Sequence, residues 1–85
     1  MSAKVKIYTT QYCPYCTKAK NLLKNRQIDF QEIDLTEDGP TREKLQSQTG
    51  WMTVPMIFIG NEFVGGCDDL HRMAQSGDLD RKLKA

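Results

Sequence analysis

Two β-rich segments separated by one helical segment occupy the first part of the chain, and this order limits the fold more than any other feature. Val5–Thr9 is rich in β-forming side chains and predicts a strand. Pro14 favours a helix start, and the apolar residues that follow recur at helical spacing, so we expect a helix over residues 14–25. Residues 29–35 alternate apolar and polar side chains and predict a second strand. Because one crossover helix joins the two strands, we expect them to run parallel in a single sheet.

Two further helices are predicted in the second part of the chain. The first covers residues 40–50, where a proline opens the segment and a glycine closes it. Leu45 is its only large apolar residue, so we expect this helix to bury a narrow face. For the second helix, Asp68 or Asp69 can act as the N-cap, and Gly77 is expected to stop it.

A predicted hairpin lies between these helices and completes the fold. Residues 54–59 and 62–64 have strand character, and the Gly-Asn pair between them is typical of a tight turn. A last helical turn is expected from Asp78. The order β-α-β-α-β-β-α predicts an α/β domain with a four-stranded mixed sheet and helices on both faces, which resembles the thioredoxin-like fold. We expect a single domain over residues 1–85, because a chain of this length is too short for two.

The charge balance and the apolar runs argue against several classes of protein. Lys plus Arg is 12 and Asp plus Glu is 11, a net charge of +1, whereas general nucleic-acid and membrane binders carry excess positive charge. The longest apolar run is Met56–Ile59, far too short to span a membrane. Residues 1–6 lack the apolar stretch of a signal peptide, and three cysteines are too few for a secreted disulfide scaffold. We therefore expect a cytoplasmic protein.

Cys13-Pro14-Tyr15-Cys16 joins a predicted strand to a predicted helix, and a C-x-x-C motif in that position is typical of thiol–disulfide exchange. The attacking species is a thiolate, and the unpaired N–H groups and the dipole of a helix N-terminus favour that anion. Cys13, at the cap position, is therefore the expected nucleophile. Cys16 lies one turn inside the helix, where it can attack a disulfide formed on Cys13 and release the substrate.

A structural zinc site is the alternative role for this pair. Cys67 and His71 could complete a set of three cysteines and one histidine with Cys13 and Cys16. However, Pro14 stiffens the first pair into a helix start, whereas zinc knuckles usually carry glycine and polar residues around their ligands. The motif therefore favours redox chemistry over metal binding.

Three motifs follow one another along the chain: Cys13–Cys16, Thr-Val-Pro at residues 53–55 and Gly-Gly-Cys-Asp-Asp-Leu at residues 65–70. Together they resemble a glutaredoxin of the dithiol type, in that family's order and spacing and over nearly the whole chain. The resemblance implies a glutathione-dependent oxidoreductase that reduces protein disulfides and protein–glutathione mixed disulfides. Glutathione would be the electron donor, with no tightly bound cofactor and no metal. The resemblance also implies a monomer, with ribonucleotide reductase as a candidate substrate.

By this resemblance, Thr53-Val54-Pro55 forms one side of a glutathione site beside the cysteine pair. The family implies a cis peptide bond before Pro55. The N–H and C=O groups of Val54 would bind the cysteine of glutathione as a short antiparallel strand. Without the family, the same segment predicts only the start of a strand. Tyr15 is expected to flank the same groove.

The start of the last long helix is implied as the other side of the site. The N–H groups of Cys67 and Asp68 would hold the γ-glutamyl carboxylate, Asp68 would pair with the amine, and Gly66 would keep the backbone open. The glycine carboxylate needs a cation, and relatives often carry a Lys three residues before the first cysteine. Thr10 stands there in this chain. Arg42 is therefore expected to bind this carboxylate alone; otherwise it is an ordinary solvated residue.

Two rival classes of function remain. A thioredoxin-like enzyme reduced by a flavoprotein would lack the motif at residues 65–68 and usually carries Gly-Pro between its cysteines. A scaffold for zinc or for a shared iron–sulfur cluster mostly lacks the proline that Pro14 supplies here. Cys67 is expected to be a buried, inert thiol. Trp51 is expected either to line the substrate groove or to cover the second helix.

Overall fold

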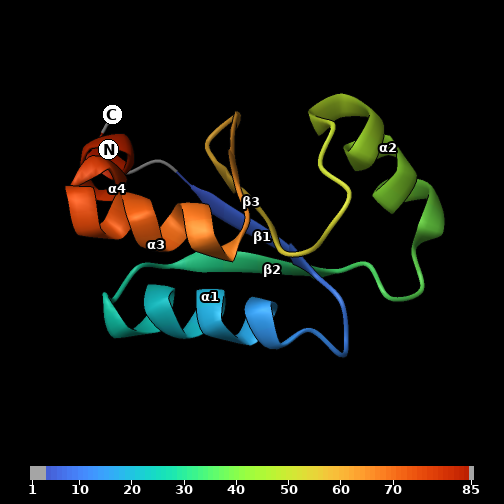
Figure 1. The fold of residues 1–85 in the computed structure, drawn as a ribbon, viewed down its shortest axis with the longest axis horizontal. Coiled ribbons are helices and arrows are strands. Elements are labelled where there is room, and N and C mark those ends of the chain that lie inside the picture. Colours follow the sequence, from blue (N-terminus) through green and yellow to red (C-terminus); the bar gives the residue numbers. More distant parts are fainter. Residues whose placement is uncertain (1–3, 85) are drawn as a thin grey trace.

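The computed structural model describes residues 4–84 and has one four-stranded sheet at its centre (Figure 1). Its strands are β1 (Val5–Thr9), β2 (Phe30–Asp34), β3 (Met56–Ile59) and β4 (Glu62–Gly65). They lie in the order β2-β1-β3-β4. β1 and β2 run parallel, and the pairs β1–β3 and β3–β4 are antiparallel. The predicted parallel pair and the predicted hairpin are therefore confirmed.

Four helices connect and flank the strands: α1 (Pro14–Asn25), α2 (Gly39–Thr49), α3 (Cys67–Ser76) and α4 (Asp78–Lys84). α1 is the crossover helix between β1 and β2, with the bounds that the sequence predicts. The expected last helical turn is present as α4. Within residues 4–84, none of the helices combines the length and the apolar character needed to cross a membrane.

The helices cover both faces of the sheet, as predicted. On one face, α1, α3 and α4 pack against β1 and β3 through a core of fully buried residues: Ile7, Leu23, Ile57, Leu70 and Leu79. On the other face, Leu45 of α2 packs in a smaller core with Leu35 and Met56. Leu45 is the only buried residue of α2, which confirms the narrow buried face expected from its sequence.

The start of α3 differs from the sequence expectation. The helix begins at Cys67 and its N-cap is Gly66, so the prediction that Asp68 or Asp69 is the cap was wrong. Asp69 lies at the third helical position, and its carboxylate accepts a hydrogen bond from the Gly66 N–H at 3.1 Å. This side chain thus satisfies a backbone donor at the helix start from inside the helix, as the acidic residue of a capping box does.

Candidate active site

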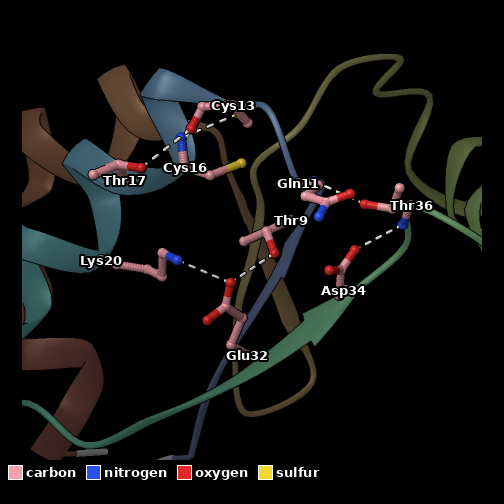
Figure 2. Close-up of polar contacts among 9 residues, drawn as sticks. All are labelled: Thr9, Gln11, Cys13, Cys16, Thr17, Lys20, Glu32, Asp34 and Thr36. Carbon is pink, nitrogen blue, oxygen red and sulfur yellow. Dashed lines mark hydrogen bonds and ion pairs between the residues drawn. The ribbon is translucent and has the colours of Figure 1, made fainter.

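The N-terminus of α1 holds both cysteines of the C-x-x-C motif (Figure 2). Cys13 is the N-cap, in an extended conformation, and its Sγ accepts a hydrogen bond from the Cys16 N–H at 3.1 Å. Its thiol also lies within hydrogen-bonding reach of the Val54 carbonyl, with 3.6 Å between sulfur and oxygen. The N–H end of the helix is therefore directed at the sulfur that the sequence predicts as the nucleophile.

The second cysteine differs from the first in its exposure. Cys16 is only 2% exposed, whereas Cys13 is half-buried. Burial, together with the hydrogen bond and the charge of Cys13, raises the pKa of the Cys16 thiol to about 12. Cys16 therefore remains protonated and shielded near neutral pH. This difference supports the predicted order, in which Cys13 attacks first and Cys16 resolves.

A groove of about 490 Å³ collects most of the residues predicted to bind glutathione. Of that predicted set, all but one line the groove: Tyr15, Thr53, Val54, Pro55, Gly66, Cys67 and Asp68. The Val54–Pro55 bond is cis, as the resemblance implies. β3 begins only at Met56, two residues later than the sequence predicts, since Pro55 has no N–H to donate to the sheet. Val54 and Pro55 thus belong to the groove rather than to a strand.

The start of α3 forms one wall of this groove. N–H groups in the first turn of a helix have no partner within their own helix, so those of Cys67 and Asp68 are available to an anion. Gly66 lies directly against Trp51, because a Cβ atom on Gly66 would be 3.1 Å from Cζ2 of the indole ring. The absence of a side chain at Gly66 therefore lets α3 approach the indole and close the groove.

Trp51 meets both of the alternatives expected from the sequence, lining the groove and covering α2. It lines the groove, and its ring packs into the core cluster that contains Leu45 of α2. The indole meets the ring of Phe63 edge-on, with 5.8 Å between centroids. Trp51 therefore connects the groove wall to the smaller core of the molecule.

The arginine that lines the groove is not the one that the sequence singled out. Arg42 is on α2 and is not among the residues that line the groove, so its role at the glycine carboxylate stays a prediction. Arg72 lines the groove and pairs with Asp69 at 3.6 Å. Sequence analysis missed Arg72 because an Arg three residues after an Asp is typical of an ordinary ion pair on a helix surface. Its side chain is 76% exposed, so this pair is weak and Arg72 can turn toward another anion.

Cys67 is the third thiol near the groove and the residue that the zinc alternative requires. It is buried, as expected from the sequence, and burial raises the pKa of its thiol, with a further increase from the Asp68 charge. Across residues 4–84, no three His, Cys, Asp or Glu side chains form a group that could hold a metal ion.

Related sequences decide the family. The sequence model of the Glutaredoxin family matches residues 5–64, which include the cysteine motif and the cis proline. The chain is 49% identical over 81 residues to a glutaredoxin of Pseudomonas aeruginosa, covering 95% of this chain and 96% of that protein. The chain belongs to the glutaredoxin family. This glutaredoxin is also 44% identical over 82 residues to glutaredoxin 3 of Escherichia coli, covering 96% of this chain and 99% of that protein.

Solved glutaredoxin structures share the fold. The buckwheat glutaredoxin–glutathione complex matches with a TM-score of 0.90 at 29% identity, covering 96% of this chain and 77% of that one. The glutaredoxin of Brucella melitensis matches with a TM-score of 0.87 at 44% identity, covering 98% and 90%. The predicted thioredoxin-like glutaredoxin fold is thus confirmed, and this glutaredoxin is a thiol–disulfide oxidoreductase.

Proposed function

We propose that this glutaredoxin uses glutathione to reduce protein disulfides and protein–glutathione mixed disulfides. The observation that carries the proposal is the groove that brings the backbone of Val54 and the start of α3 together beside Cys13. A tripeptide with a central cysteine and a carboxylate at each end needs such features, namely a backbone edge for hydrogen bonds and a helix N-terminus for an anion. The buckwheat relative, solved as a complex with glutathione, supports the same ligand.

Each charged end of glutathione has a candidate partner. The N–H groups of Cys67 and Asp68 bind the γ-glutamyl carboxylate, and the exposed Asp68 carboxylate pairs with the amine on the same carbon. The backbone of Val54 binds the central cysteine. The glycine carboxylate takes its cation from Arg42, the residue implied by the resemblance, or from Arg72, the residue that lines the groove.

Removal of glutathione from a protein needs only Cys13. Its thiolate attacks the glutathione sulfur of the mixed disulfide, the protein thiolate leaves with the electron pair and takes a proton, and Cys13 now carries glutathione. A second glutathione thiolate attacks this adduct. Glutathione disulfide is released and Cys13 returns as a thiolate.

Reduction of a protein disulfide needs both cysteines. Cys13 attacks the disulfide and forms a mixed disulfide with the substrate protein. Cys16, whose N–H is bonded to the Cys13 sulfur, then attacks that sulfur and releases the reduced substrate. The resulting Cys13–Cys16 disulfide is reduced by two glutathione molecules in succession.

Mass analysis of the Cys16→Ser variant after exposure to oxidised glutathione tests the proposal. Since the resolving thiol is absent, we expect one glutathione to remain on Cys13. The variant should still remove glutathione from proteins and should no longer reduce protein disulfides, whereas Cys13→Ser should abolish both reactions. The proposal is wrong if no adduct forms on Cys13 or if the two substitutions impair both reactions equally.

The setting of this reaction is part of the proposal. A reducing cytoplasm supplies the glutathione that the cycle consumes, and Cys13, Cys16 and Cys67 are all free thiols. Ribonucleotide reductase is one candidate among its disulfide-bearing substrates, and we propose that the chain acts as a monomer.

A further inference from the structure

Three polar side chains that take no part in the reaction above form a connected network beside Cys16 (Figure 2). Thr9 Oγ1 donates a hydrogen bond to Glu32 Oε2 at 2.8 Å. Lys20 Nζ donates to the same carboxylate oxygen at 3.0 Å. The network therefore connects β1, β2 and α1 through one oxygen atom.

Two members of this network are shielded from water, whereas the Glu32 side chain that joins them is 39% exposed. Thr9 is 1% exposed, so its hydroxyl holds the Glu32 carboxylate from inside the protein. The side chain of Lys20 is only 25% exposed, and its ion pair is therefore less screened than one on the open surface. Lys20 follows Cys16 by four residues in α1, a spacing that places both side chains on one face of the helix.

Lys20 differs in charge from the other groups around Cys16. Three titratable groups act on Cys16 or on Lys20: Cys13 at the N-cap of α1, and Glu32 and Asp34 on β2. All of these groups are neutral or negative, and the neutral Thr9, at the end of β1, lies against the Glu32 carboxylate. A backbone hydrogen bond from Thr10 and, to a smaller extent, the positive charge of Lys20 lower the pKa of the Cys16 thiol, against the increase caused by burial and by Cys13. Lys20 is the cation in this set.

We propose that Thr9 and Glu32 are positioning residues that hold the Lys20 ammonium beside Cys16, and that this charge promotes the resolving attack of Cys16. The inference rests on the proposed function, since only the reduction of protein disulfides uses Cys16. In this step the Cys16 thiol gives its proton to water, and its thiolate attacks the Cys13 sulfur. The Cys13–Cys16 bond forms, the bond from Cys13 to the substrate sulfur breaks, and the substrate thiolate leaves with the electron pair.

The aromatic disulfide dithiobis(nitrobenzoate), used in equimolar amount, separates the two cysteines in one stopped-flow trace. Attack by Cys13 releases a first coloured thiolate, and attack by Cys16 on the mixed disulfide releases a second. The Cys16→Ser variant should show only the first release, which assigns the second phase to Cys16. The rate of each phase can then be followed as a function of pH.

We expect Lys20→Met to slow the second phase about three- to tenfold near neutral pH, because loss of the positive charge makes the Cys16 thiolate harder to form. Its pH profile should move to higher pH, while the first phase stays unchanged. Lys20→Arg, which keeps the charge, should restore the second phase. Lys24→Met removes an exposed lysine one turn further along α1 and is the matched control, expected to leave both phases unchanged.

A variant of Thr9 tests whether its hydroxyl helps to position Lys20 through Glu32. Thr9→Val keeps the shape of the buried side chain and removes the hydroxyl that holds Glu32, so it should slow the second phase in the same direction as Lys20→Met. An unchanged second phase in Thr9→Val overturns the positioning role. An unchanged rate and pH profile in Lys20→Met, or a slow phase that Lys20→Arg does not restore, overturns the whole inference. A failure of the unsubstituted protein to form a mixed disulfide on Cys13 would instead refute the proposed function.

Discussion

The two cysteines of the motif lie within one helical turn, and each sulfur has different surroundings. Cys13 is half-buried at the helix start, beside the carbonyl of Val54, whereas Cys16 is 2% exposed between α1 and the sheet. Burial and the neighbouring Cys13 raise the pKa of the Cys16 thiol to about 12. A thiol with a raised pKa keeps its proton through neutral pH and becomes a thiolate only as the pH approaches that value.

Alkylation of the reduced protein should therefore be selective. At neutral pH we expect iodoacetamide to label Cys13 and to spare Cys16, and peptide mass mapping over a series of pH values would measure both. Labelling of Cys16 should increase only as the pH rises toward 12, or when denaturant removes its burial. In Cys13→Ser, Cys16 should remain slow to react, because burial is the larger cause of its raised pKa. Equal labelling of both cysteines in the folded protein at pH 7 would contradict this assignment.

At the scale of the secondary-structure elements, α3 depends on an acidic side chain inside its own first turn. Gly66 is the N-cap and has no side chain with which to cap the helix, so Asp69 accepts the hydrogen bond from the Gly66 N–H. The same carboxylate pairs with Arg72, which is largely exposed. The cap bond should therefore contribute more to stability than the ion pair does.

Asp69→Ala and Arg72→Ala separate these two contributions. We expect Asp69→Ala to lower the free energy of unfolding by about 1 kcal/mol, because it leaves the Gly66 N–H without its partner. Arg72→Ala should lower the same free energy by less than about 0.5 kcal/mol, since it removes only an exposed ion pair. Urea denaturation of both variants measures the difference. Equal losses would mean that the ion pair, and not the cap, stabilises the start of α3.

Local signals explain which elements the sequence could predict. α1 has the predicted bounds because a proline at its start and the helical spacing of its apolar residues both lie within the segment. The start of α3 was not predictable, since two aspartates are equally good local caps, whereas the observed cap is Gly66, whose N–H is bonded by Asp69 from inside the helix. The first two residues expected in β3 instead line the groove, because Pro55 has no N–H to donate to the sheet.

The residues of the candidate site also fall into two groups, those that the sequence could predict and those that it could not. Its cysteines and most of its groove residues belong to short motifs and could be named from the sequence. The network of Thr9, Lys20 and Glu32 could not be named, because its members are 12 and 23 residues apart. They meet only when β1 and β2 pair in parallel in one particular register, which no local pattern specifies.

At the scale of the whole molecule, the redox site and α4 lie toward opposite ends of α1 (Figure 1). Cys13 is at the start of α1, whereas α4 lies beyond the other end of this helix, at the end of the long axis opposite α2 (Figure 1). Leu79 of α4 is fully buried in the larger core, together with Leu23 near the end of α1. Leu83, one turn after Leu79, packs on the same core and is only partly buried. Changes in α4 should therefore affect stability without reaching the chemistry.

Leu79→Ala tests this separation. Because Leu79 is 0% exposed, we expect the substitution to lower the free energy of unfolding by about 2–4 kcal/mol through lost burial and the cavity that remains. Leu83→Ala is the matched control and should cost less, since the removed atoms are partly in contact with water. Urea denaturation gives both values, and the yield of the glutathione adduct on Cys13 reports on the site. We expect that yield per folded molecule to be the same in both variants as in the unsubstituted protein. A lower yield in Leu79→Ala under conditions where it is fully folded would show that the packing of α4 does reach the start of α1.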